Sequence, residues 1–196
     1  ITMVGLYNKA NKEQLIEQLE KETFNRLTIS FYRYVNINNL DELRDVLYEK
    51  WSQINILGRI YIAEEGINAQ ISIPENKLNE FKKDLNSYKE FQNMEFKFAV
   101  EDKISFYKLI IKIKNEIVSY KIKKNEYNMN KIGTHLNAQE FNQLIEQDNS
   151  VVVDMRNHYE SEVGKFENAI CPDVDTSEEL LPETKKLLQK NKEDNI

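Results

Sequence analysis

Five cations lie on or beside segments in which apolar and polar residues alternate: Arg33, Arg59, Lys108, Lys112 and Lys114. Within 106–114 the lysines alternate with leucine and isoleucine, so one face of a strand would be basic and the other buried. Tyr32, Tyr34 and Tyr61 stand close to the arginines in the sequence. Cations and aromatic rings on one surface are typical of contacts with phosphates and unpaired bases. A solvated lysine edge that prevents sheets from associating would show the same pattern, so both interpretations stay open.

A second polar group lies at the end of the apolar run 150–156. Asp154 and Arg156 stand at the C-terminal end of this run. In open parallel sheets, ligands bind outside that end of the strands. A structural role is the favoured alternative: Asp154 would accept backbone N–H bonds, and Arg156 would pair with Glu160.

The remaining reactive side chains do not form a recognisable site. Cys171 is followed by Pro172 and has neither a basic cluster nor a helix N-terminus beside it, the features that activate a thiolate. We therefore expect Cys171 to be a small buried apolar residue. His135 and His158 lack carboxylate or cysteine neighbours at ligand spacing, so we expect no metal site.

Composition narrows the class of protein. The chain has 196 residues, 40% of them hydrophobic, and a single cysteine, which excludes a disordered chain and a disulfide framework. No run approaches the ~20 apolar residues of a membrane helix, and no signal segment opens the chain, so we expect a cytoplasmic protein without membrane contact. Residues 129–196 carry 7 Lys+Arg against 14 Asp+Glu, whereas residues 1–128 carry 20 against 19. This asymmetry indicates two units with different partners.

Hydrophobic periodicity predicts an α+β domain over 25–122. After a helical segment within 1–24, strands and helices are expected in the order β-α-β-β-α-β, which is typical of the ferredoxin-like fold. The expected ranges are 27–35, 39–54, 59–64, 67–73, 75–88 and 94–100, with Glu65-Gly66 as the hairpin turn. Ile29, Phe31 and Val35 share the apolar face of the first strand, which Arg33 interrupts. Two extra strands are expected at 106–114 and 117–122.

The second part of the chain has a different pattern. Residues 123–132 are polar without a period and are expected to form a linker. Beyond it, a capping box of Asn137 and Glu140 predicts a helix over 137–147, and the run 150–156 is typical of a buried parallel strand. Further helices are expected at 157–163 and 177–190. The unpaired edge of this sheet predicts association with a second copy, as a homo-oligomer or by domain swapping.

Three segments carry a resemblance to a known family. TISFYRY (28–34), GRIYIAEEGINAQISIP (58–74) and VVVDMRNHYESEVGKFENA (151–169) occur in the order found in bacterial rhodanese-domain tRNA uridine(34) hydroxylases. Over about 25–190 the chain resembles the N-terminal portion of that family. The resemblance implies an acylphosphatase-like domain followed by the first part of an α/β rhodanese-like domain at 133–196. The chemistry of acylphosphatases themselves is not expected, because loop 35–39 has neither glycine nor arginine.

The resemblance also implies a function for the full-length protein. This function is the oxygen-dependent 5-hydroxylation of wobble uridine-34, with tRNA as partner, molecular oxygen as co-substrate and any further cofactor unknown. An essential cysteine would lie in a loop beyond Ile196, so we expect no catalytic residue and no activity in this chain alone. Cys171 would not replace that cysteine, whereas Asp154, Arg156 and Glu160 would support the rhodanese-like fold. A rhodanese-type sulfurtransferase and a non-catalytic RNA-binding module remain alternatives.

Overall fold

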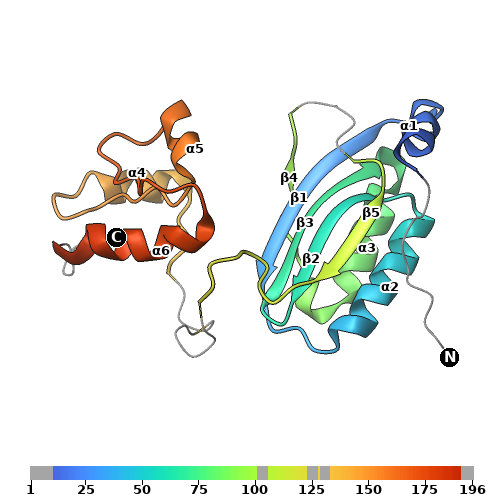
Figure 1. The fold of residues 1–196 in the computed structure, drawn as a ribbon, viewed down its shortest axis with the longest axis horizontal. Helices are drawn as coiled ribbons and strands as arrows, with labels where there is room; N and C mark the ends of the chain where they lie inside the picture. The colour runs from blue at the N-terminus through green and yellow to red at the C-terminus, as the bar shows by residue number, and fades with distance from the viewer. Residues whose placement is uncertain (1–10, 101–105, 123–127, 129–132, 191–196) are drawn as a thin grey trace. The chain divides into compact units, whose positions relative to one another are not determined.

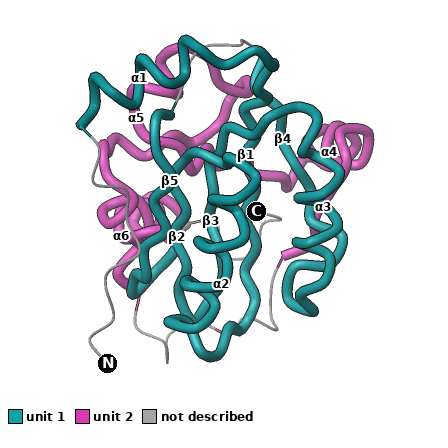
Figure 2. The backbone as a smooth tube through the Cα atoms, turned by 90° about the vertical axis from the view of Figure 1, so that its right-hand side faces the viewer, with its two compact units in different colours: residues 1–117 teal, residues 118–196 magenta. Residues whose placement is uncertain are grey.

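The computed structural model describes residues 11–100, 106–122, 128 and 133–190. Within it the chain divides into two compact units, residues 1–117 and 118–196 (Figure 2). The expected linker 123–132 lies, apart from Asn128, outside the described residues. None of the described helices is long and apolar enough to cross a membrane.

The first unit contains a mixed sheet of five strands with two helices on one side of it (Figure 1). Helix α1 (Lys12–Glu20) comes before this sheet. The sheet elements follow as β1 (Arg26–Tyr34), α2 (Leu40–Gln53), β2 (Leu57–Ala63), β3 (Gly66–Pro74), α3 (Leu78–Ser87), β4 (Lys97–Phe98) and β5 (Leu109–Ile113). The spatial order is β4-β1-β3-β2-β5. Only β5 runs parallel to its neighbour, β2. The predicted β-α-β-β-α-β order is therefore confirmed, with one added strand.

The alternation of residue types decides which face of the sheet is buried. Alternate residues of β2 and β3 lie in the core beneath α2 and α3: Ile60, Ile62, Ile67, Ala69, Ile71 and Ile73. The helices contribute Leu47, Trp51, Phe81 and Leu85, all at most 1% exposed. The Trp51 and Phe81 rings meet edge to face with centroids 5.1 Å apart. Full burial of one such side chain stabilises the fold by about 1.5–3 kcal/mol, so this layer holds the sheet in place.

Gly66 allows the β2–β3 hairpin to pack closely against β1. Its φ of +151° is rarely adopted by residues with a side chain, and a Cβ there would lie 2.1 Å from the Arg33 carbonyl oxygen. Only glycine therefore permits this approach without moving the backbone. The turn itself consists of Glu64 and Glu65, one residue earlier than the predicted Glu65-Gly66 turn.

Two of the expected strands differ from the prediction. The segment 94–100 pairs with β1 only at Lys97 and Phe98. Met94 is buried in the core without strand pairing, and Val100 is exposed. The expected strand 117–122 does not form. Instead the Ile117 N–H donates to the Glu65 carboxylate at 2.8 Å, and its carbonyl accepts from the Asn68 amide at 3.3 Å. These side-chain bonds replace a strand ladder.

The second unit contains α4 (Ala138–Ile145), α5 (His158–Val163), α6 (Ser177–Leu187) and the 3-10 turn η3 (Leu188–Lys190). The capping box of Asn137 and Glu140 is confirmed at the start of α4. The expected buried parallel strand at 150–156 is wrong. Within the described residues only the bridge between Val153 and Ile170 forms, in parallel, and the valines are half-buried. A parallel strand becomes fully buried only with neighbours and covering helices on both faces.

Candidate functional site

The face of the sheet opposite α2 and α3 carries polar, basic and aromatic side chains. We call it the open face, and its members include Ser30, Tyr32, Arg59, Tyr61, Asn68, Gln70, Lys97 and Lys112. The strand pairings place Tyr32 opposite Asn68, Asn68 opposite Tyr61, and Tyr61 opposite Lys112. Four neighbouring strands thus form one row from Tyr32 to Lys112. The next row contains Ser30, Gln70 and Arg59, with Lys97 opposite Ser30.

The strands that form the open face carry charged side chains of one sign. None of the five strands contains an aspartate or glutamate. Arg59, Lys97 and Lys112 are exposed. Lys114, just after β5, is also exposed, and its Nζ lies 5.4 Å from the centroid of the Tyr61 ring. A cation over a ring face is held there by the quadrupole of the ring, so this ammonium is positioned on the sheet.

The structure separates one predicted RNA-binding residue from the others. Arg59, Lys112 and Lys114 lie together on or beside the open face, and Lys108 is half-buried just before β5. Arg33 instead follows the parity of Ile29 and Phe31 on the helix-covered face. Its guanidinium donates to the carbonyl oxygens of Gln92 at 2.6 Å, Asn93 at 2.9 Å and Glu90 at 3.4 Å. Arg33 therefore holds the segment after α3 in place.

Asn68, Gln70 and Lys97 belong to the open face but were not predicted from the sequence. The alternation of Asn68 and Gln70 with buried residues was the available signal for the first two. Lys97 is placed by its pairing with Ser30, because β4 reaches β1 only at the edge of the sheet. A pairing between segments so far apart in the chain produces no local pattern in the sequence from which it could be predicted.

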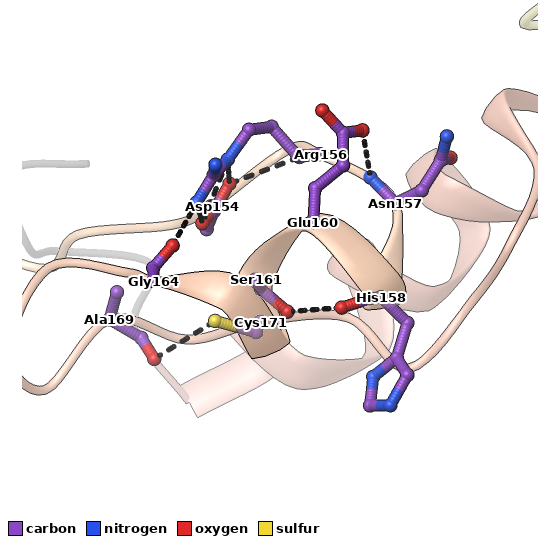
Figure 3. Close-up of polar contacts among 9 residues, drawn as sticks. All are labelled: Asp154, Arg156, Asn157, His158, Glu160, Ser161, Gly164, Ala169 and Cys171. Carbon is purple, nitrogen blue, oxygen red and sulfur yellow. Dashed lines mark hydrogen bonds and ion pairs between the residues drawn. The ribbon is translucent and has the colours of Figure 1, made fainter.

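The second polar group surrounds Asp154 (Figure 3). The Arg156 guanidinium binds both carboxylate oxygens, with Nε 2.9 Å from Oδ1 and Nη2 2.6 Å from Oδ2. The same Nη2 donates to the Gly164 carbonyl at 2.6 Å. The Asp154 side chain is only 8% exposed, and its hydrogen bonds from Arg156 hold the pKa of this carboxyl below its usual value.

Glu160 has a different partner from the one expected. It accepts a hydrogen bond from the Asn157 backbone N–H at 3.2 Å, as the capping box of α5, whereas Arg156 pairs with Asp154. Asp154 does accept the Arg156 backbone N–H at 3.2 Å, as expected. The bonds from Arg156 to Asp154 and Gly164 join the end of the apolar run to the end of α5.

A cavity of about 440 Å³ adjoins this ion pair. It is lined mainly by apolar side chains and the ion pair itself: Phe141, Val152, Val153, Asp154, Met155, Arg156, Gly164, Lys165 and Phe166. The half-buried Cys171 is not among these residues, and its Sγ donates to the Ala169 carbonyl at 3.6 Å. His158 lies 3.2 Å from both Glu162 and Asp173, and His135 is exposed. In the part of the chain that is described, no group of three or more histidine, cysteine, aspartate or glutamate side chains could hold a metal ion.

Comparison with known proteins gives these surfaces a context. Residues 26–117 match the family model of the UPF0176 acylphosphatase-like domain. The chain is 53% identical over 177 residues to the tRNA uridine(34) hydroxylase of Leptospira interrogans, covering 90% of this chain and 48% of that protein. It is 40% identical to the tRNA uridine(34) hydroxylase of Enterobacter sp., covering 99% of this chain and 56% of that protein.

The chain is homologous to tRNA uridine(34) hydroxylases. It spans about half the length of the curated relatives that it matches. Two solved structures resemble this chain weakly. A BlrP1 BLUF protein has a TM-score of 0.32 at 12% identity, covering 47% of this chain and 65% of that one. BlsA in its photo-activated state has a TM-score of 0.36 at 19% identity, covering 63% of this chain and 95% of that one.

The segments that carried the family resemblance also form the two polar surfaces of this chain. TISFYRY lies within β1, and GRIYIAEEGINAQISIP forms β2, its turn and β3. Together they provide most of the open face. The third segment, 151–169, contains the Asp154–Arg156 pair and α5.

Proposed function

We propose that this chain is part of an enzyme that hydroxylates uridine-34 of tRNA at carbon 5, with molecular oxygen as co-substrate. The observation that carries the proposal is the 53% identity over 90% of the chain to a relative of that name. The activity is assigned to the full-length protein, because the chain corresponds to about half of such relatives. A tRNA substrate implies that the reaction occurs in the cytoplasm.

We further propose that residues 133–196 belong to a rhodanese-like domain. The parallel bridge between Val153 and Ile170, with helices before and after it, supports an α/β unit. In this domain Asp154 and Arg156 are positioning residues. The shortest hydrogen bonds of Arg156, both 2.6 Å, are donated to Asp154 and Gly164. The pair therefore fixes the backbone beside the cavity and does not contact substrate.

Cys171 is proposed not to be the reactive thiol of the enzyme. A reactive thiolate is stabilised by N–H donors, a cation or a helix N-terminus. Cys171 instead points its sulfur at the carbonyl oxygen of Ala169, two residues away (Figure 3). The nearby cation, Arg156, is bound to the Asp154 carboxylate. The essential cysteine of the full-length protein is therefore expected elsewhere.

Mass spectrometry of tRNA nucleosides tests the function. We expect a deletion strain to lose 5-hydroxyuridine at position 34, and the full-length gene to restore it. The gene carrying Cys171→Ser should restore it equally well, as a matched control. Loss of a thiolated base would instead indicate a sulfurtransferase, and an unchanged nucleoside profile would indicate a non-catalytic RNA-binding protein; either result would refute the proposed hydroxylase.

A further inference from the structure

We propose that the open face binds a single-stranded stretch of RNA, with a base stacked on Tyr32 and phosphates held by Arg59, Lys97 and Lys112. The inference rests on the proposed function only in taking RNA as the ligand. It concerns a binding step that can be measured without hydroxylation.

Charge on the open face favours an anionic partner. The chain has a net charge of −6, yet the five strands contain arginine and lysine and no carboxylate. A surface of one sign on an oppositely charged protein concentrates anions locally. Phosphate groups are therefore attracted to this face, whereas the excess of acidic residues lies within 129–196.

Protection against sheet association does not account for the whole pattern. Lysines that prevent association are needed on edge strands. Lys97 and Lys112 do lie on the edge strands β4 and β5, and at Tyr32 β1 pairs, within the described residues, only with β3. Arg59, in contrast, is paired on both sides, with Gln70 of β3 and Ile110 of β5. A position that is paired on both sides has no free edge to protect, so Arg59 requires another explanation.

Tyr32 offers a stacking surface. Its side chain is 57% exposed, and at this position β1 pairs with β3 through Asn68. A phenol ring standing on a rigid sheet can stack with any base, and such stacking is tolerant of sequence. Three strand spacings of about 4.8 Å separate Tyr32 from Lys112, a span of about 14 Å. A stacked strand advances about 3.4 Å per nucleotide, so the span equals about four nucleotides. Asn68, in the middle of the row, is bonded to the Ile117 carbonyl, so we expect the strand to contact the row at its two ends, Tyr32 and Lys112.

The geometry of the sheet selects single strands over duplexes. Paired bases in A-form RNA stack on one another, and the deep major groove is closed to side chains. Tyr32 could therefore reach only unpaired bases. The amide of Gln70 is exposed in the neighbouring row, where it can donate to and accept from the edge of a base held there.

Fluorescence anisotropy with the whole chain tests the inference. The probes are a short labelled oligouridylate and an RNA duplex of the same length. We expect the oligouridylate to bind more tightly than the duplex. Tyr32→Ala should weaken this binding about 5- to 150-fold, and Tyr32→Phe, which retains the ring, should leave it within about threefold.

Tyr159 provides a matched control, because it is also 57% exposed but lies in the second unit. We expect Tyr159→Ala to leave the oligouridylate affinity unchanged. Preference for the duplex, absence of binding, or an equal effect of the two alanine variants would overturn the inference. The nucleoside assay above is independent: it can fail while Tyr32-dependent binding persists, and binding can fail while 5-hydroxyuridine still depends on the gene.

Discussion

Neutralising two lysines beside Tyr61 tests the electrostatic part of the open face quantitatively. Arg59, Lys97, Lys112 and Lys114 are its exposed cations. If each contacts one phosphate of a single strand, the logarithm of the binding constant should fall with the logarithm of salt concentration with a slope of about −2.8, at about 0.7 per phosphate. The double variant Lys112→Gln/Lys114→Gln retains two contacts, so its slope should be about −1.4.

The same arithmetic predicts how the affinity depends on salt. Two lost contacts remove about 1.4 logarithmic units at ~0.1 M salt, so the double variant should bind about 25-fold more weakly there. The two binding curves should converge as the salt concentration approaches ~1 M, because counterion release then contributes little. Oligouridylate anisotropy over a series of salt concentrations measures both quantities.

A matched variant separates direct contacts from total charge. Lys83→Gln/Lys89→Gln removes the same charge from α3 and from the turn that follows it, away from the open face. We expect its slope to equal that of the wild type. An unchanged slope in Lys112→Gln/Lys114→Gln would refute the reasoning and leave those lysines as a solvated edge. Equal slopes in both double variants, each below the wild type, would refute it as well, since only the net charge would matter.

Three further predictions concern stability. Gly66→Ala should lower the free energy of unfolding by about 1–3 kcal/mol or more, because the added Cβ would meet the backbone of β1 at a strained φ. An unchanged midpoint of urea denaturation would contradict this. Asp84→Ala should lower the free energy of unfolding by about 1–3 kcal/mol, measured by tryptophan fluorescence in urea. The buried Trp51 indole N–H donates to the Asp84 carboxylate at 2.9 Å and would lose its acceptor. Asp84→Asn, which keeps an acceptor oxygen, should recover part of the loss. Arg156 lowers the pKa of Asp154, so that carboxylate stabilises the fold above about pH 4 and the contribution disappears as the pH falls through the lowered value. The difference in unfolding free energy between wild type and Asp154→Asn, followed by circular dichroism, should therefore shrink below about pH 4, and a difference that stays constant with pH would contradict it.

Local patterns in the sequence were sufficient to predict several elements. The capping box of Asn137 and Glu140 involves residues three apart, and it begins α4 as predicted. The alternation within 106–114 placed Leu109 and Ile111 in the core and left Lys112 exposed. These features depend on residues that are close in the sequence, within one or two helical turns or strand positions. They can therefore be recognised from the sequence alone.

Other features depended on distant partners and were decided by the tertiary structure. The row from Tyr32 to Lys112 exists only because β1, β3, β2 and β5 pair in one register. The run 150–156 has strongly apolar residues, yet burial of a strand requires neighbours on both sides, and only Ile170 pairs with it among the described residues. Arg33 combines a local and a distant contribution. Its alternation with Ile29 and Phe31 along the sequence indicated that it lies on the helix-covered face. Only the fold supplied the carbonyl oxygens, about 60 residues away in the chain, that bind its charge there.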